Sequence, residues 1–172
     1  LKEENGLNYS NKKITISTSG IANKISEAAN EIWTYLALSL HAPNDKLREK
    51  IMPINRKFKI KDLIEQLKYY TSIVKEPIFL EYVMLKNIND TEDCAKQLVK
   101  LMAKFPCKVN LIEFNSWPGV KFEPTERKNI EKFSKFIQNK GYMSFIRRSR
   151  GDDVLAACGQ LRTESKKNSK IN

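Results

Sequence analysis

The feature that most constrains the fold of this chain is a repeated alternation of strand-like and helix-like segments. Five short runs have the composition and length of β-strands, at residues 13–18, 35–40, 78–85, 109–114 and 142–146. The run at 35–40 (YLALSL) is almost continuously apolar, which is typical of strands covered on both faces in a parallel sheet. Alternation of this kind predicts an α/β fold built on a parallel sheet.

Helical spacing of apolar residues fills the stretches between these runs, at residues 21–32, 45–51, 60–74, 91–105, 124–140 and 154–161. The helix at 60–74 places Ile60, Leu63 and Leu67 on one stripe, which predicts that this stripe is buried. Pro124 is expected to open the helix at 124–140. Since an ordinary closed barrel of this kind needs eight strands, five strands predict part of an open or partial barrel.

Three regions divide the sequence. Residues 1–11 predict a flexible lead-in, residues 12–161 contain the alternation, and residues 162–172 predict a basic, disordered tail. The apolar fraction of 41% is sufficient for a buried core. No run of about 18 apolar residues exists, so we expect no transmembrane helix and no membrane partner.

An excess of positive charge indicates which classes of binding partner the chain attracts. Lys and Arg number 31 against 20 Asp and Glu, and the formal charge of +11 favours nucleic acid and other anionic surfaces. A lysine-rich proteome is the alternative explanation. The three cysteines, Cys94, Cys107 and Cys158, form no CxxC pair, which fits a reducing cytosol and predicts a cytoplasmic location.

Polar residues gather where three of the predicted strands end. Ser17 lies at the end of the first strand, and Ser39 and His41 lie at the end of the second. Asn115 directly follows the fourth strand. Ligands of α/β sheets bind beyond the carboxyl ends of the strands, so these groups suit a polar, neutral-to-cationic small molecule. Taken singly, such serines and asparagines are usually turn formers, and a lone histidine is usually structural.

Seven motifs along residues 12–161 make the chain resemble a known family. They are STSG (17–20), SLHAPND (39–45), MPINRKF (52–58), EYVML (81–85), PCKVNLI (106–112), RGDD (150–153) and AACGQL (156–161). The same motifs occur in the same order in the RlmN-type dual-specificity adenine methyltransferases, which are radical-SAM enzymes that modify 23S rRNA and certain tRNAs. The Cfr resistance proteins are close relatives of that family. The resemblance implies a partial (β/α) barrel of radical-SAM type, containing its C-terminal strands only.

The same resemblance implies a binding site for S-adenosylmethionine (SAM). In the family, the first serine of STSG, the SLH triplet and the asparagine that closes the NLI strand contact SAM. These positions correspond here to Ser17, Ser39, Leu40, His41 and Asn115. They are the strand-end residues that position alone singles out. One departure is that Ser116 follows where the family usually has proline, which loosens the match of this loop.

Cys158, in AACGQL, matches the cysteine that the family first methylates with one SAM molecule. In the family, a 4Fe-4S cluster then reductively cleaves a second SAM to give a 5′-deoxyadenosyl radical, which takes a hydrogen atom from the methyl group on sulfur. The resulting carbon radical adds to carbon 2 of adenine, and a second cysteine releases the product through a transient disulfide. Carbon 2 is not nucleophilic, whereas a thiolate is, which explains the need for cysteine. Arg147, Arg148 and Arg150 offer positive charge that favours the thiolate or binds RNA phosphate.

The CxxxCxxC motif that binds the cluster in the family is absent from this sequence, as is the partner cysteine. We therefore expect the cluster ligands upstream of residue 1, in a missing N-terminal half, and expect the isolated chain to be inactive. The alternatives are a non-catalytic remnant of a split gene that retains RNA binding, a Cfr-like carbon-8 methyltransferase, or an unrelated α/β protein. Without the resemblance, Cys158 would be interpreted as a small buried residue. The sequence leaves the role of Glu81, the oligomeric state and the choice between rRNA and tRNA open.

Overall fold

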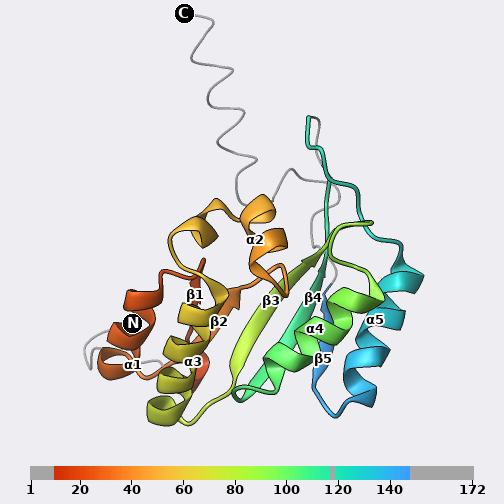
Figure 1. The fold of residues 1–172 in the computed structure, drawn as a ribbon. Helices are drawn as coiled ribbons and strands as arrows, with labels where there is room; N and C mark the ends of the chain where they lie inside the picture. Colours follow the sequence, from red (N-terminus) through yellow and green to blue (C-terminus); the bar gives the residue numbers. More distant parts are fainter. Residues whose placement is uncertain (1–9, 117–118, 148–172) are drawn as a thin grey trace, which may run out of the picture.

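Five parallel strands form a single sheet in the computed structural model, which describes residues 10–116 and 119–147. The strands are β1 (Thr15–Thr18), β2 (Tyr35–Ser39), β3 (Ile78–Met84), β4 (Cys107–Glu113) and β5 (Ser144–Arg147). Their order in the sheet is their order in the chain, and every neighbouring pair is parallel (Figure 1). The predicted α/β architecture with a parallel sheet is confirmed.

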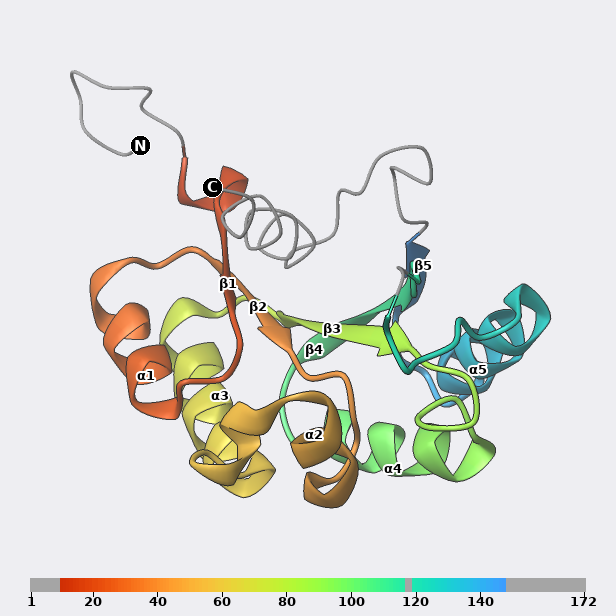
Figure 2. The ribbon, with the colours of Figure 1, turned by 90° about the horizontal axis from the view of Figure 1, so that it is seen from above.

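The five α-helices of the described residues lie on one face of this sheet (Figure 2). They are α1 (Ala22–Glu31), α2 (Asp45–Ile51), α3 (Ile60–Val74), α4 (Glu92–Met102) and α5 (Arg127–Asn139). Short 3-10 turns precede β1 at Asn11–Lys13 and follow α2 at Pro53–Arg56. Each crossover advances by one strand in the same direction, and crossovers between parallel strands share one hand, so successive helices fall on the same side. This is the arrangement of part of a barrel wall.

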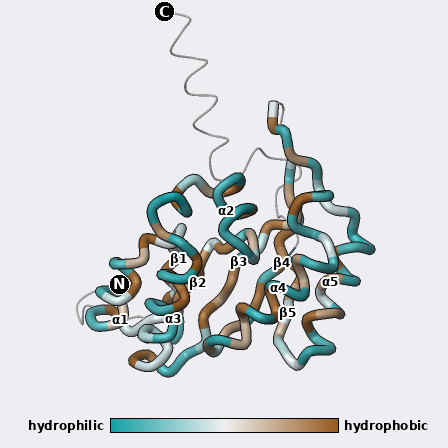
Figure 3. Tube along the Cα trace, viewed as in Figure 1, coloured by the Kyte–Doolittle hydropathy of each residue, from teal (hydrophilic) through white to brown (hydrophobic). Residues whose placement is uncertain are grey.

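The hydrophobic core lies between the sheet and the helices. Along β3, the side chains of Ile78, Leu80, Tyr82 and Met84 are fully buried, whereas the residues between them are half-buried. The stripe of α3 that the sequence predicts is buried against this side. Figure 3 shows the strands in the hydrophobic colours and much of the helical layer in the hydrophilic ones. Burial of these apolar side chains is the main stabilising contribution to the fold.

The other side of the sheet is not covered by any α-helix of the described residues, and we call it the open face. Its side chains alternate with those of the core, since successive residues of a strand point to opposite faces. The register of the strands assigns to it Thr15, Ser17, Tyr35, Ala37, Ser39, Phe79, Glu81, Val83, Lys108, Asn110, Ile112, Phe145 and Arg147. Hydroxyl, carboxylate, amide and cationic groups therefore share one surface with three aromatic rings.

Most element bounds agree with the sequence predictions, but the start of α5 does not. This helix begins at Arg127 and not at Pro124. Pro124 instead forms an isolated antiparallel bridge with Leu85, and the N–H of Lys86 donates to the carbonyl oxygen of Glu123 at 3.0 Å. The segment before the helix is thus held extended against the end of β3, a tertiary contact that local spacing cannot reveal.

Several predictions concern segments beyond the described residues. The predicted helix at 154–161, the basic tail and residues 1–9 of the lead-in lie there, as does Cys158. Asn11, assigned to the lead-in, begins the first 3-10 turn. No helix in the described ranges is both long and apolar enough to cross a membrane.

Candidate functional site

Ser17 and Ser39 lie on the open face, on neighbouring strands. Ser17 on β1 pairs with Ala37, which stands two residues before Ser39 on β2. Two residues of a strand span roughly 7 Å, so both hydroxyls lie within reach of one small ligand. Ser17 is exposed and Ser39 is half-buried.

The next residue, Leu40, presents its main chain at the end of β2. Its side chain is buried in the core, with 1% of its surface exposed. Its N–H donates to the carbonyl oxygen of Glu81 at 3.0 Å, and the N–H of His41 donates to the same oxygen at 3.1 Å. The end of β2 is therefore fastened to the middle of β3.

His41 stands in a strained backbone conformation with a fixed ring. Its φ of 56° lies in the left-handed region, which non-glycine residues adopt at some cost in energy. The side-chain amide of Asn89 donates to the His41 carbonyl oxygen at 2.8 Å. The Nδ1 atom of the ring accepts the N–H of Val83 at 3.1 Å, so a neutral ring holds its proton on Nε2.

The charge state of His41 follows from its surroundings. Burial of the ring, and secondarily the positive charge of Arg48, lowers the pKa of His41 from 6.5 to about 4. The imidazole is therefore neutral near pH 7, and the end of β2 offers a neutral N–H donor without a positive charge.

Arg48, on α2, is a residue that the sequence reasoning missed. Its side chain is fully buried, with 0% of its surface exposed, and its guanidinium contacts the ends of both β1 and β2. Burial lowers the pKa of Arg48, and the Asp45 carboxylate acts in the opposite direction. In the sequence, nothing in residue type separates Arg48 from the exposed Lys46 and Lys50 beside it.

Glu81 lies in the middle of the open face, in register with Ser39 on one side and Asn110 on the other. The side-chain amide of Asn110 donates to Oε1 of Glu81 at 2.7 Å. This answers the question that the sequence left open, because the carboxylate faces the open side and its hydrogen-bond partner is an amide. Lys108, a neighbouring cation, lies over the ring of Phe79 at 5.7 Å.

The remaining predicted residues are more distant or outside the described ranges. Asn115 follows the end of β4 by two residues and is half-buried. It lies at the same end of the sheet as His41, but β3 stands between their strands, a separation of about 10 Å across the sheet. Arg147 ends β5 on the open face and is exposed. The positions of Cys158, Arg148 and Arg150 lie outside the described residues.

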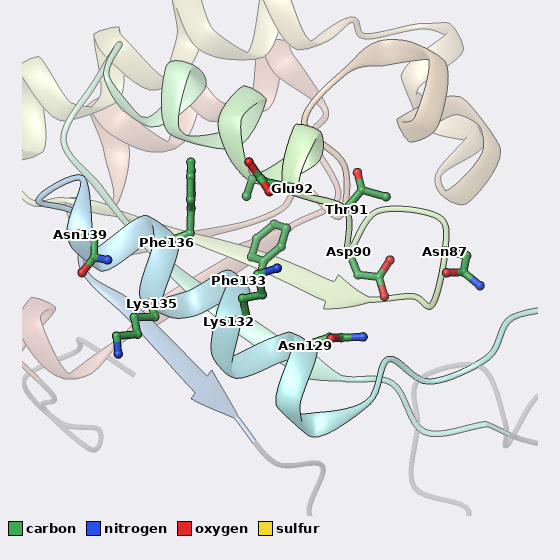
Figure 4. Close-up of a pocket in the computed structure, with 11 residues that line it drawn as sticks. Asn87, Asp90, Thr91, Glu92, Asn129, Lys132, Phe133, Lys135, Phe136 and Asn139 are labelled. Atoms are coloured by element: carbon green, nitrogen blue, oxygen red, sulfur yellow. The ribbon is translucent and has the colours of Figure 1, made fainter.

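A separate hollow of about 420 Å³ lies on the helical side of the sheet, between α4 and α5. Figure 4 shows Phe133 and Phe136 of α5 facing Thr91 and Glu92 at the start of α4. None of the predicted SAM contacts lines this hollow, so it is not part of the candidate site. Among residues 10–116 and 119–147, no three His, Cys, Asp or Glu side chains gather as a metal site.

The relatives found by comparison with known proteins carry one and the same description. The chain is 46% identical over 168 residues to the dual-specificity RNA methyltransferase RlmN of Mesorhizobium japonicum, and 45% identical over 166 residues to that of Rhodopseudomonas palustris. These alignments cover 97% and 96% of this chain, but only 41% and 42% of the relatives. The chain therefore spans about two fifths of the length of the curated relatives that it matches. No family model matches the sequence.

Solved structures agree with these relatives. A radical SAM methyltransferase from Sphaerobacter thermophilus superposes with a TM-score of 0.88 at 38% identity, over 92% of this chain and 47% of that protein. A domain of the pyruvate-formate lyase-activating enzyme from Bacteroides vulgatus superposes with a TM-score of 0.61 at 12% identity, which shows the fold alone. By sequence and by structure, this chain is similar over nearly its whole length to part of the RlmN dual-specificity RNA methyltransferases and to part of a radical SAM methyltransferase.

Proposed function

We propose that this chain provides the SAM-binding rim and the methyl-accepting cysteine of an RNA methyltransferase that acts on carbon 2 of adenosine in 23S rRNA and tRNA. The observation that supports this most directly is the placement of Ser17 and Ser39 on one open face, beside a neutral His41. Relatives named as dual-specificity RNA methyltransferases support the choice of RNA as the substrate. The formal charge of +11 is consistent with that choice.

The electrostatics of the open face suit SAM, whose sulfonium is cationic. The carboxylate of Glu81 lies in the same row as Ser39, and opposite charges attract strongly at a site partly shielded from water. The neutral imidazole of His41 adds no repulsion. The Ser17 and Ser39 hydroxyls both donate and accept hydrogen bonds, as recognition of ribose hydroxyls and of the amino acid end of SAM requires. Asn115 contributes an amide at the same end of the sheet.

Cys158 is the proposed methyl acceptor. The thiol first loses its proton, and the thiolate then attacks the methyl carbon of SAM. A carbon–sulfur bond to Cys158 forms as the bond between the methyl group and the sulfonium breaks, which leaves S-adenosylhomocysteine and a methylated cysteine. Arg147 ends the strand that precedes this segment, and its positive charge would favour the thiolate.

A 4Fe-4S cluster supplies the reductive cleavage of SAM in radical-SAM chemistry. The described residues offer no set of ligands that fits it, so we assign none of them to the cluster. We propose that its cysteines come from the part of the RlmN relatives with which this chain does not align. We also propose a cytoplasmic location, in keeping with a cysteine set that has no CxxC pair.

The role of Cys158 is tested by substitution in a protein that joins this sequence to the cluster-binding part of a relative. Cys158→Ala should abolish methylation of 23S rRNA and tRNA, measured as 2-methyladenosine by mass spectrometry of digested RNA. Cys107→Ala is the matched control, because burial raises the pKa of the Cys107 thiol to about 12 and makes it a poor nucleophile.

Two outcomes would contradict the proposal. Retention of 2-methyladenosine in the Cys158→Ala protein would show that another group accepts the methyl. Formation of 8-methyladenosine by the unmodified protein would place the reaction at carbon 8 and favour the Cfr-like alternative.

A further inference from the structure

We propose that Arg48 is a positioning residue for the SAM site, and that the motifs at 39–45 and 52–58 together form the device that holds it. This inference rests on the proposed function, because it concerns the residues assigned there to SAM. It accounts for two motifs of the chain that direct contact with SAM explains only in part, namely the end of SLHAPND and the whole of MPINRKF.

The guanidinium of Arg48 joins the carbonyl oxygens at the ends of two strands. Its Nη2 donates to the carbonyl oxygens of Ser19, at 2.7 Å, and Ser39, at 3.0 Å. Its Nε donates to the carbonyl oxygen of Leu40 at 3.1 Å. One planar group thus fixes the segment after β1 relative to the end of β2, and these are the segments that present Ser17 and Ser39.

A second layer holds Arg48 itself. Its Nη1 donates to Oδ1 of Asn55 at 3.0 Å, and the Asn55 amide donates to Oδ1 of Asp45 at 2.8 Å. The same Asp45 oxygen accepts the N–H of Ile60 at 2.9 Å, at the start of α3. The 3-10 turn at Pro53–Arg56 places Asn55, which is fully buried, between the arginine and the aspartate. The start of α2, this turn and the start of α3 therefore share one hydrogen-bond network.

The space around the guanidinium also restricts the neighbouring residue. A Cβ added to Gly20 would lie 2.9 Å from Nη2 of Arg48 and 3.2 Å from the methyl groups of Leu63. Gly20 also has a φ of +98°, which favours glycine. The buried arginine thus requires a glycine as the last residue of STSG, the motif that also contains Ser17.

Packing alone does not explain why the charged side chain of Arg48 is buried between the helical layer and the strand ends. Burial of a guanidinium without a directly paired carboxylate has a large desolvation cost, and apolar residues of similar volume often stabilise a core as well or better. What an apolar side chain cannot do is bind three carbonyl oxygens in fixed directions. A lysine cannot do so either, because its single ammonium lacks the planar fork of arginine. The geometry therefore favours a role in orienting the strand ends.

The test uses the 172-residue chain without an affinity tag, so that His41 is its single histidine and gives one set of imidazole resonances in NMR spectra. SAM is titrated into the unmodified chain and into Arg48→Lys, Arg48→Met and Asn55→Ala, and the His41 shift gives the affinity. Ile137→Ala, a fully buried change on α5, is the control for loss of stability without contact with the device.

We expect Arg48→Lys and Arg48→Met to weaken SAM binding by about tenfold or more, since small displacements of positioned groups have large effects. Asn55→Ala should weaken binding in the same direction and supplies the test if either arginine variant fails to fold. Ile137→Ala should change the affinity by less than about twofold, because distant sites act independently. In the Arg48 variants the His41 resonances should also move before any SAM is added.

The outcomes separate the two proposals. If the unmodified chain shows no saturable SAM binding, the proposed SAM-binding rim is wrong and this inference fails with it. If the unmodified chain binds SAM and the folded Arg48 variants bind it equally tightly, only the positioning role is overturned. The positioning role is also overturned if Ile137→Ala, at an equal loss of thermal stability, weakens binding as much as Arg48→Lys.

Discussion

Acidification should destabilise this protein through a single imidazole. In the folded chain, burial and the charge of Arg48 lower the pKa of His41 from 6.5 to about 4. The unfolded chain binds the proton near pH 6.5, whereas the folded chain resists it until about pH 4. The unfolded state therefore holds more protons within this window, and stability falls as the pH falls through it. Above pH 6.5 the contribution is fully present.

The size of the effect follows from the same pKa values. Each pKa unit corresponds to about 1.4 kcal/mol, so the change from 6.5 to about 4 gives about 3 kcal/mol at most. That is a large fraction of the free energy of unfolding of a typical domain, which is about 5–15 kcal/mol. Loss of this one contribution would visibly shift an unfolding curve.

The measurement is urea unfolding at several pH values between 6.5 and 4, compared with His41→Gln. Carboxylates titrate in both proteins, so the difference between the two isolates the imidazole. NMR titration of the single histidine gives its pKa directly. The reasoning is refuted if the ring titrates near 6.5, or if the two proteins lose stability in parallel as the pH falls.

Three further predictions concern single residues elsewhere in the fold. Gly20→Ala should lower the free energy of unfolding by about 3 kcal/mol in urea titrations, because the added methyl group clashes with its neighbours and the backbone conformation is strained for alanine. Gly141 has a φ of +84° but open space around it, so Gly141→Ala should lower the free energy of unfolding by about 1 kcal/mol only. Equal costs would argue against the clash. Asn89→Ala should cost about 3 kcal/mol or more by the same method, because the fully buried amide satisfies three main-chain groups at the ends of β2 and β3. A cost below about 1 kcal/mol would mean that other groups replace those bonds. In a Cys158→Ser chain, a colorimetric thiol reagent should find no fast-reacting thiol near pH 7, because Cys94 is buried and burial raises the pKa of Cys107 to about 12. A rapid reaction would show that one of these two thiols is accessible.

Local sequence signals predicted the elements that are stabilised locally. The bounds of α2 and α3 agree with the predicted helices at 45–51 and 60–74. The side chain of Asn44 accepts the N–H of Leu47 at 3.0 Å, an N-cap that marks the start of α2. The start of α5 was predicted wrongly because Pro124 is held in a bridge to a residue far away in the sequence. Local spacing contains no information about such a bridge.

The candidate site was predictable only where it depends on topology. Parallel strands expose their carboxyl ends at one edge, so the location of Ser17, Ser39 and His41 at one edge of the sheet was predictable, whereas their contact with SAM stays a prediction. The burial of Arg48 and the pairing of Glu81 with Asn110 depend on side chains from separate strands and helices. Residue type alone does not distinguish a buried arginine from a solvated one, and these contacts therefore required the structure.

The one-sided helical layer has a consequence for how this chain can change over time. Along β3, alternate residues serve different needs, because one set fills the core and the other faces the open side. Substitutions in the first set disturb the packing of the core, whereas substitutions in the second set leave that packing in place. Side chains of the open face can therefore be exchanged while the packed scaffold is preserved, even where the two sets are adjacent along a single strand.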